Sequence, residues 1–573
     1  RFVVRLVVCK VIYICTSQIL PMISNLRYWF LIVLIFLVYV AGMFVTLFEN
    51  DSAQFSVMAM RMVQENDFFS LFKGPEEYLD KPHMHYWLAA LSYKIFGIHD
   101  WAYRIPGILS TLLAAYSCYG LGSLLYNKHV GKLAALVFMT AQTIVLGAID
   151  VRTDAVLTGF SILAIWQLTK YIEKGSIKAI GIGAFAAGIA FSTKGQIALL
   201  VIGLPILCHL TYTRKWNAFL SWKVLLALLV FAVTITPMLY AYYLQFDLHP
   251  EKVIRGKDHR SGIFFIFWEQ SFERLSGEGI GKNSSDYFFF FHTFLWVFLP
   301  WTILGITAFY NKAKSFIKLK FKYVPGYEFL TIGGITLIFI IISFAQFKLP
   351  HYLNITIPLF AVITASYIYN LYTTDKEKTI RLLMYGQYFV LSIVFIASAL
   401  ICFYVFKLRS MVAYVFLIAA SVMIIYYALK REGVYMKLVT ISVCASLLLN
   451  AVLNLHFYPN LLDYQGGSSM SKVIKEKDIP VDRIYKVGKD YSWSLDFYNQ
   501  YPVQLTTVDF LKDKKDIWVY VNDEEMSLLQ SKGFDWDSQL SVDQFRITRL
   551  QGKFLNPNTR KKVTRKMHLL HIY

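Results

Sequence analysis

Charged side chains are scarce in this sequence of 573 residues, at 16% of the total, whereas hydrophobic residues make up 56%. A soluble protein of this length carries far more charge, so the composition excludes a chain that folds wholly in water. Cysteine is also rare: all six cysteines lie in apolar stretches, and residues 458–573 contain none. The sequence therefore lacks both a disulfide framework and a cysteine-based metal motif.

A formal net charge of +20 is also found in proteins that bind nucleic acid. The distribution of the charge indicates otherwise, because Lys and Arg lie mostly in short breaks between apolar runs and near the printed C-terminus. Basic loops of this kind are held at a membrane surface by anionic lipid. We therefore predict no nucleic-acid partner.

The sequence begins with Arg1 and reaches its first methionine before a long apolar run at Met22. We interpret residues 1–21 as an upstream leader without functional weight. The first apolar run after Met22 is about 20 residues long and no A-x-A-like cleavage site follows it, which indicates an uncleaved membrane helix rather than a signal peptide.

About thirteen apolar runs follow one another over residues 22–457, each near the length that crosses a bilayer. They predict a polytopic α-helical membrane protein whose transmembrane domain occupies this range. The predicted spans are 28–47, 105–125, 132–149, 154–171, 178–193, 196–212, 222–243, 287–309, 328–346, 352–371, 383–405, 411–429 and 437–457.

Basic residues concentrate in alternate connections between these spans, most densely at Lys312, Lys314, Lys318, Lys320 and Lys322. The positive-inside rule assigns those connections to the cytoplasm. Two long loops, 48–104 and 244–286, then lie outside the membrane, together with residues 458–573. Helical and strand patterns alternate in this tail, in SMSKVIKEKD, RIYKVG, IWVYV, DEEMSLLQSKG and QFRITRL, and a final strand is expected at its end. We predict a small C-terminal extracytoplasmic α/β domain, without a catalytic motif of its own.

The predicted topology gathers the unusual charged residues on the outer face. These are Asp51, Asp80, Lys81, Arg104, Asp150, Arg152, Asp154, Lys194 and Lys348. Any one of them alone is explained as a snorkelling anchor at a membrane end. Nine on one face, beside two long loops, predict an active or binding site at the outer leaflet.

The first outer loop contains two helical patterns, which we expect to form amphipathic helices on the membrane surface. Asp51 and Ser52 are candidate N-caps of the first helix. The second follows Pro82, with a buried stripe at Trp87, Leu88, Leu91 and Ile95. His83 and His85 are two residues apart, which is a poor metal spacing on a helix, so we interpret them as interfacial. His351 lies in a tight outer turn and is a better site candidate.

Four stretches occur in order over roughly residues 48–360: NDSAQF…AMRMV…DF, then YLDKPHMHYWLAALSYKIFG, then RTDAVLTGF…AFSTKG, and FLPW followed by FKLPHYLNITIP. Together they resemble the ArnT-like and protein-O-mannosyltransferase-like (PMT) superfamily of membrane glycosyltransferases with the GT-C fold. The resemblance implies a bacterial inner-membrane enzyme that moves a sugar from a polyprenyl (undecaprenyl) phosphate donor to a lipid, glycan or protein acceptor. It also implies an active site and C-terminal domain in the periplasm, with lipid A modification as one known role of the family.

The resemblance also implies roles for individual residues. Asp51 matches the base of the first-loop motif, and Asp154 is the second acidic residue that the family has near its site. Lys81, Lys194, Lys348 and Arg274 are expected to bind the donor phosphate, whose charge grows as it leaves. Further polar residues expected at the site are Asp80, Arg104, Asp150 and His351.

The sequence departs from close ArnT relatives at several of these positions. Gln54 and Phe55 replace an Arg-Tyr pair, Asp80 replaces Glu, and Gln270-Ser271 replaces a His that helps to bind metal in some members. Sugar, acceptor and a divalent metal, for which Asp80 is the candidate ligand, stay open. We expect a monomer. The alternatives are a secondary transporter, which should have ionisable groups near the midplane and two similar halves, and a non-catalytic scaffold.

Overall fold

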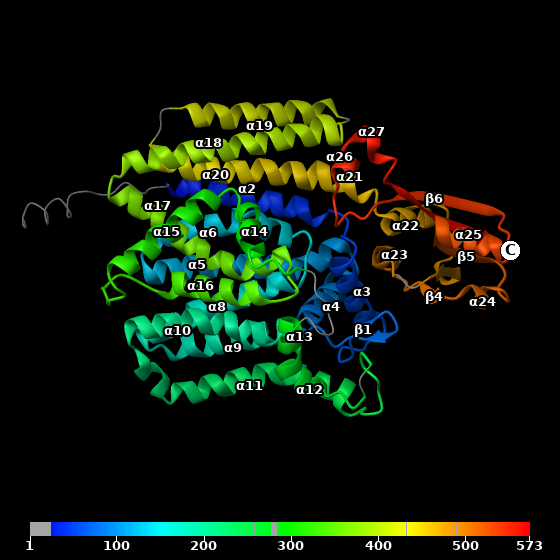
Figure 1. The fold of residues 1–573 in the computed structure, drawn as a ribbon, viewed down its shortest axis with the longest axis horizontal. Helices are drawn as coiled ribbons and strands as arrows, with labels where there is room; N and C mark the ends of the chain where they lie inside the picture. The colour runs from blue at the N-terminus through cyan, green and yellow to red at the C-terminus, as the bar shows by residue number, and fades with distance from the viewer. Residues whose placement is uncertain (1–23, 257, 277–283, 409, 431–432, 489–490) are drawn as a thin grey trace, which may run out of the picture.

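The computed structural model describes residues 24–573 except 257, 277–283, 409, 431–432 and 489–490. Residues 1–21, interpreted as a leader, lie outside the described part of the chain. Within it, ten helices are long and apolar enough to cross a membrane, and they form the bundle in Figure 1. They are built on α2 (Asn25–Met43), α5 (Asp100–Leu125), α8 (Thr153–Lys174), α9 (Ile177–Lys194), α10 (Gln196–Thr213), α11 (Lys223–Tyr242), α17 (Ile357–Thr373), α18 (Glu377–Ala399), α19 (Met411–Leu429) and α20 (Val434–Val452). The predicted polytopic helical fold is confirmed.

The other three predicted spans are shorter or interrupted. Range 132–149 forms α6 (Lys128–Thr140) and α7 (Gln142–Gly147), range 287–309 forms α14 (Phe289–Val297) and α15 (Thr302–Lys318), and range 328–346 forms α16 (Leu330–Phe344). Pro300 lacks the N–H that a continuous helix needs. The two interruptions meet, because the Gln142 amide donates to the Leu299 carbonyl at 2.9 Å. Backbone groups released by one break are therefore satisfied by the other, as an apolar environment requires.

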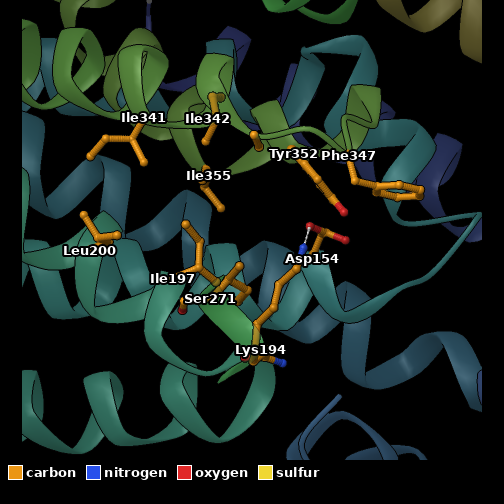
Figure 2. Close-up of a pocket in the computed structure, with 13 residues that line it drawn as sticks. Asp154, Lys194, Ile197, Leu200, Ser271, Ile341, Ile342, Phe347, Tyr352 and Ile355 are labelled. Atoms are coloured by element: carbon orange, nitrogen blue, oxygen red, sulfur yellow. Dashed lines mark hydrogen bonds and ion pairs between the residues drawn. The ribbon is translucent and has the colours of Figure 1, made fainter. Parts of the chain in front are cut away.

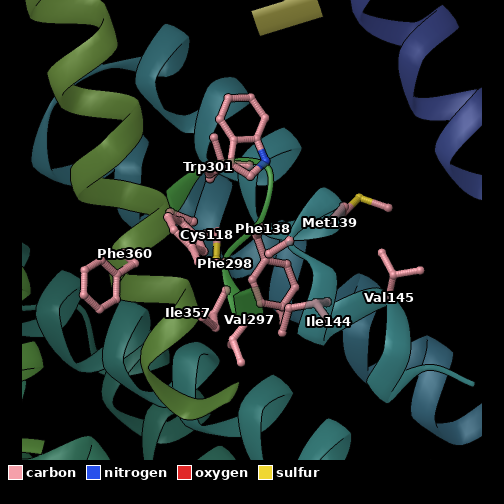
Figure 3. Packing of buried hydrophobic residues seen from close by; sticks show 14 of the residues in the cluster. Cys118, Phe138, Met139, Ile144, Val145, Val297, Phe298, Trp301, Ile357 and Phe360 are labelled. Carbon is pink, nitrogen blue, oxygen red and sulfur yellow. The ribbon is translucent and has the colours of Figure 1, made fainter. Parts of the chain in front are cut away.

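Aromatic side chains fill the core where these interrupted helices meet their neighbours (Figure 3). Trp301 is fully buried and donates its indole N–H to the Thr140 hydroxyl at 2.8 Å. The rings of Phe294 and Phe360 lie 4.3 Å apart between centroids. Apolar side chains are exposed on the outside of the bundle, for example Val412 on α19, as expected for a surface that faces lipid.

The first long loop folds into α3 (Asp51–Gln64), a hairpin of β1 (Phe72–Lys73) and β2 (Glu76–Glu77), and α4 (Met84–Phe96). The two predicted helices are present, but the environment expected for the first of them is wrong. Helix α3 is buried on most faces, because it lies between α4 and α23 (Trp493–Asn499) of the tail. It is an inner layer between bundle and tail rather than a helix lying on a membrane surface.

Three details of this loop correct the sequence interpretation. The N-cap of α3 is Asn50, and Asp51 is the first helical residue. Leu91 and Ile95 are 56% and 63% exposed, so the predicted buried stripe of α4 is its outer face. His83 and His85 are buried, not interfacial, and burial lowers the pKa of each to about 4. An apolar stripe cannot by itself distinguish protein from lipid as its neighbour.

The second long loop contains η2 (Tyr243–Asp247), α12 (Gly262–Phe264), η3 (Phe265–Glu269) and α13 (Gln270–Ser276). Short elements complete the bundle at η1 (Trp216–Leu220), η4 (Pro350–Thr356), η5 (Leu400–Val405), η6 (Leu453–Phe457) and α21 (Tyr458–Leu462).

The tail forms a five-stranded sheet in the order β4-β3-β5-β7-β6. The strands are β3 (Ile484–Val487), β4 (Gln504–Thr506), β5 (Ile517–Asn522), β6 (Ser538–Gln544) and β7 (Arg565–Ile572), with helices α22 (Gly466–Glu476), α24 (Val508–Leu511), α25 (Asp523–Ser531), α26 (Gly552–Leu555) and α27 (Pro557–Arg560), and with η7 (Val481–Arg483). The predicted α/β tail is confirmed. The strand expected at 544–550 is wrong, because β6 ends at Gln544 and pairs with β7 before that range.

Hydrogen bonds tie the tail to the start of the first long loop. Glu49 accepts from the Ser494 amide at 3.2 Å and from the Ser494 hydroxyl. The Gln465 side chain donates to the Leu47 carbonyl at 2.9 Å, and the Leu47 amide donates to the Tyr498 hydroxyl at 2.8 Å. The residues before Asp51 are therefore positioned by the tail as well as by the bundle.

Candidate functional site

Five segments that are distant in the sequence meet at the end of the bundle nearest to the tail. They are the N-terminus of α3, the turn before α8, the first turn of α8, the last turn of α9, and η4. Each contributes a charged or polar residue, in that order Asp51, Arg152, Asp154, Lys194 and His351. The first and last members of this site, Asp51 and His351, are therefore 300 positions apart in the sequence.

Arg152 is the centre of this arrangement. Its Nη1 atom donates to Asp51 Oδ2 at 2.7 Å, and its Nη2 atom donates to Asp150 Oδ2 at 2.8 Å. Burial opposes the charge on the guanidinium, but Asp150 and Asp51 outweigh it and raise the pKa of Arg152 above its ordinary value. Arg152 is thus a permanent cation that fixes two carboxylates.

The polar chain continues from Arg152 into the bundle. His351 Nδ1 lies 3.3 Å from Arg152 Nη1, and its Nε2 atom lies 3.7 Å from Asp154 Oδ2. Asp154 Oδ1 then accepts from Lys194 Nζ at 2.7 Å. This last pair is buried, with side chains that are 5% and 10% exposed, whereas the Asp51 side chain is 40% exposed. Asp51 is accordingly the accessible end of the chain and Lys194 the enclosed end.

Lys194 and Asp154 close one end of an apolar cavity of 130 Å³. Figure 2 shows Ile341 and Leu200 toward one end of this cavity and Asp154 and Tyr352 toward the other. The Lys194 ammonium also lies 4.7 Å from the centre of the Tyr352 ring. Leu200 is both a wall residue and 37% exposed, so the apolar end reaches the lipid-facing surface of the bundle. The cavity is therefore amphiphilic, with an ion pair at one end and hydrocarbon walls at the other.

Gln270 connects this cavity to the second basic candidate. It lines the cavity, and its Nε2 atom donates to the Asp80 carbonyl at 2.7 Å. The Asp80 carboxylate pairs with Lys81 at 2.8 Å and lies 3.7 Å from Arg255. Asp80 and Lys81 thus lie beside the cavity, in a group of alternating charges.

The other predicted residues lie elsewhere. Arg104 is fully buried and donates to the carbonyls of Ile149, Met43 and Thr46, so it braces the backbone around the site. Lys348 donates to the Ser284 carbonyl at 3.2 Å and lies over the Tyr287 ring, outside the wall of the cavity. Arg274 is on α13, but its side chain is outside the described part of the structure.

A divalent metal ion at this site would need several carboxylate or imidazole ligands close together. Within the described residues, no three His, Cys, Asp or Glu side chains are arranged to hold a metal ion. Asp80, the candidate ligand, has two cationic neighbours, Lys81 and Arg255. The donor set at Asp80 therefore does not fit a divalent cation.

The sequence predicted Asp51, Asp154 and Lys194 as site residues, and the structure brings them together. It gave no role to Arg152, Gln270 or Tyr352. Arg152 had a visible signal, since it stands between Asp150 and Asp154 at the start of an apolar run. Gln270 was noted only because it stands where some family members have a metal-binding His. Tyr352 had no signal of its own, because a phenol in an aromatic-rich stretch is a common packing residue.

The chain is similar to known proteins over part of its sequence and over most of its fold. Residues 80–240 match the family model described as dolichyl-phosphate-mannose-protein mannosyltransferase. The structure superposes on the crystal structure of ArnT from Cupriavidus metallidurans bound to undecaprenyl phosphate, with a TM-score of 0.72 over 94% of this chain and 97% of that one, at 16% identity. The chain therefore has the same fold as ArnT, the GT-C fold.

The relatives that resemble this chain in sequence match a smaller share of it than the solved structure does. The undecaprenyl phosphate-α-4-amino-4-deoxy-L-arabinose arabinosyl transferase 2 of Proteus mirabilis is 23% identical over 60% of this chain and 59% of its own length. A putative mannosyltransferase of Bacillus subtilis, YkcB, is 26% identical over 39% of this chain and 32% of its own length. The chain thus spans about three-fifths of the first of these relatives, and the names disagree on the sugar.

Proposed function

We propose that this ArnT-like chain is an integral membrane glycosyltransferase that transfers a sugar from a polyprenyl-phosphate donor to an acceptor hydroxyl, with inversion at the anomeric carbon. One observation carries the proposal: a buried ammonium, Lys194, lies at the end of an apolar cavity that reaches the lipid face. A prenyl chain needs hydrocarbon walls, and its phosphate needs a cation in a dry setting. The cavity supplies both.

Two carboxylates have different roles in this proposal. Asp154 is enclosed and bound to Lys194, so it positions the ammonium that meets the donor phosphate. Asp51 is exposed, and Arg152 binds its Oδ2 atom, while no described residue donates a hydrogen bond to Oδ1. Oδ1 is then available to an acceptor hydroxyl, which makes Asp51 the general base.

The reaction follows from these roles. The acceptor oxygen attacks the anomeric carbon while its proton passes to Asp51. The bond between the anomeric carbon and the phosphate oxygen breaks, and its electron pair stays on the lipid phosphate. Lys194 and Lys81 stabilise that growing negative charge, and a group of this kind contributes about 2–4 kcal/mol to the transition state. The products are the glycosylated acceptor and polyprenyl phosphate.

The proposed setting is the bacterial inner membrane, with the site and tail on the periplasmic side. The basic connections predict this orientation, and a donor of the undecaprenyl type fits it. Gln54 and Phe55, at positions where close ArnT relatives have Arg and Tyr, leave the sugar to be identified by experiment.

The test uses the full chain in lipid nanodiscs, incubated with a panel of undecaprenyl-phosphate sugars. We expect release of undecaprenyl phosphate from one of them. Asp51→Asn should lower transfer by about 10²–10⁴-fold, the usual contribution of a general base, without changing the unfolding temperature. Glu65→Gln is the matched control, because Glu65 is the exposed C-cap residue of the same helix and pairs with Arg61 at the surface. Normal transfer by the Asp51→Asn variant would contradict the assignment of Asp51 as general base. If the wild-type chain consumed none of the donors, the proposed function would be wrong.

A further inference from the structure

The connection between β6 and β7 is much longer than the pairing of these two strands requires. Gln544, the last residue of β6, opposes Arg565, the first residue of β7, so the strand ends are neighbours in the sheet. A hairpin connection usually has about 2–5 residues, whereas residues 545–564 number 20. The sheet alone does not account for this length. We refer to residues 545–564 as the β6–β7 connection.

The β6–β7 connection packs on the membrane bundle. Arg560 donates from its Nη2 atom to the Val405 carbonyl at 2.6 Å, and its guanidinium lies 4.2 Å from the centre of the Phe406 ring. Phe545 and Phe554 stack with ring centroids 3.9 Å apart, and both belong to the hydrophobic core of the bundle. Figure 1 shows α26 and α27 beside α21, at the end of the bundle nearest to the tail. Aromatic and guanidinium contacts therefore anchor this part of the tail to the bundle.

The anchor lies where a membrane span ends. Helix α18 continues into η5, and together they form a candidate span that ends at Val405. The next candidate span, α19, begins at Met411. Arg560 thus binds the last carbonyl of one span, close to the start of the next. The end of a span lies at the level of the lipid headgroups, so the β6–β7 connection is held at that level.

The charge of the β6–β7 connection has a single sign. Residues 545–564 contain six Lys or Arg and no Asp or Glu, whereas residues 458–544 contain ten Lys or Arg and fifteen Asp or Glu. The tail is therefore acidic over most of its length and basic in a segment that touches the end of the bundle. Lys553, Lys561 and Lys562 are exposed, and none of them forms an ion pair with another residue that the structure describes.

A basic run on a protein surface is most often simply solvated, and the anchor distinguishes this run from that case. The Thr559 hydroxyl donates to the Lys553 carbonyl at 2.6 Å, which ties α26 to α27. Lys561 and Lys562 follow α27 directly. Three lysines are thus carried by one pair of short helices that Arg560 fixes at the end of a span. Lysine clusters next to a bilayer bind anionic headgroups.

We propose that Lys553, Lys561 and Lys562 bind anionic phospholipid headgroups in the leaflet on the tail's side of the membrane. The membrane surface then holds the tail in addition to the contacts that the tail makes with the first long loop. This role is independent of the proposed reaction, because the three lysines neither line the cavity beside Lys194 nor bind Asp51.

Hydrogen exchange of the full chain in lipid nanodiscs tests the proposal. The two membranes compared are neutral phosphatidylcholine and the same lipid with added phosphatidylglycerol. We expect amides of residues 545–564 to exchange at least about fivefold more slowly in the anionic membrane, which is the effect of roughly one basic residue near such a surface. High salt should abolish the difference, because it screens exposed charges. Equal exchange in the two membranes at low salt would show a solvated connection and overturn the proposal.

Lys553→Gln/Lys561→Gln/Lys562→Gln should remove most of this slowing. Lys475→Gln/Lys477→Gln/Lys532→Gln is the matched control and should retain it, because it removes three exposed lysines from the same tail outside the β6–β7 connection. An equal loss in both variants would show general attraction of the tail to an anionic surface. Full slowing in the first variant would show that its three lysines make no contact with the headgroups. Either result would overturn the proposal.

Two further probes, added to neutral nanodiscs, separate phospholipid from other phosphate-bearing ligands. Inorganic phosphate should not slow exchange of residues 545–564, and a glycolipid with two phosphates should slow it no more than phosphatidylglycerol does. Slowing by inorganic phosphate that equals the slowing by phosphatidylglycerol would show a site for a soluble anion. Slowing by the glycolipid without slowing by phosphatidylglycerol would show a glycolipid site. Both results would contradict a phospholipid contact.

Discussion

The guanidinium of Arg152 lies 2.7 Å from the carboxylate of Asp51 and joins the N-terminus of α3 to the turn that precedes α8. The loop that carries the proposed base is thereby fixed to the helix that carries Asp154. Two parts of the site that the sequence separates by about a hundred residues are positioned by a single side chain. Substitutions of Arg152, Lys194, Asp496 and Gly74 lead to testable predictions.

Arg152→Ala should lower the rate of transfer without a matching loss of donor affinity. The substitution frees Asp51 and Asp150, and misplacement of a reacting group by about 1 Å costs on the order of 10²-fold in rate. Arg152→Lys should recover only part of the loss, because an ammonium cannot hold two carboxylates in a fixed fork. The measurements are kcat and KM for the donor, with Arg549→Ala on the tail as control. A change in KM alone would contradict a positioning role.

Lys194→Met should destabilise the protein by about 3–5 kcal/mol, because it leaves Asp154 buried without its cation. The double variant Asp154→Asn/Lys194→Met should recover most of that free energy of unfolding, since both charges are gone. It should nevertheless fail to bind undecaprenyl phosphate. Thermal unfolding in nanodiscs and lipid binding measure the two effects independently. Donor binding restored together with stability would show that Lys194 is only structural.

Asp496 should make the tail less stable as the pH rises from about 4 to about 7. Burial, reinforced by the charge of Glu49, raises its pKa from 3.8 to about 7, although the Val503 amide opposes the shift. In this window the folded state keeps a proton that the unfolded state has lost, so stability falls with pH and then levels off. Asp496→Asn should flatten the wild-type curve, by on the order of a few kcal/mol across the window. The measurement is the unfolding midpoint of the wild type and of the variant at pH 5 and at pH 8. If the midpoint changed by the same amount between the two pH values in both proteins, the role of Asp496 would be contradicted.

Gly74→Ala should loosen the contact between the first long loop and the tail. A Cβ at this position would lie 2.4 Å from Tyr491 Cε1, and the residue has a φ of 62°. Gly326→Ala is a close control, because its φ is 84° but nothing lies within 4 Å of an added Cβ. Hydrogen exchange should increase at the tail in the first variant and not in the second. A similar response in both would show backbone strain alone, which costs roughly 1–2 kcal/mol for an L-residue in the left-handed conformation.

The sequence predicted the helical bundle and the α/β tail, because hydrophobic length and the pattern of apolar and polar residues are visible in the sequence itself. It did not predict the environment of α3, since contact with the tail involves residues more than 400 positions away. It placed Leu91 and Ile95 on the wrong side of α4, because lipid and protein interior select the same apolar residues. Arg152 was visible as a charge, but only the fold shows that it binds Asp51.

Some spans were predicted as continuous because their interruptions have no signal in the local sequence. Apolar runs such as 132–149 have the composition of a full span, and no proline marks the change of direction at Ala141. The interruption depends on the Leu299 carbonyl, which lies in a different predicted span. Pairing between two breaks is a property of the folded bundle and has no local pattern.

Leu200 is part of the cavity wall and also part of the outer surface of the bundle. A carrier that uses this opening would exchange by two-dimensional diffusion within the leaflet and would never pass through water. Turnover would then respond to the fluidity and acyl-chain order of the surrounding bilayer, and the solubility of the carrier in the aqueous phase would have no influence on it.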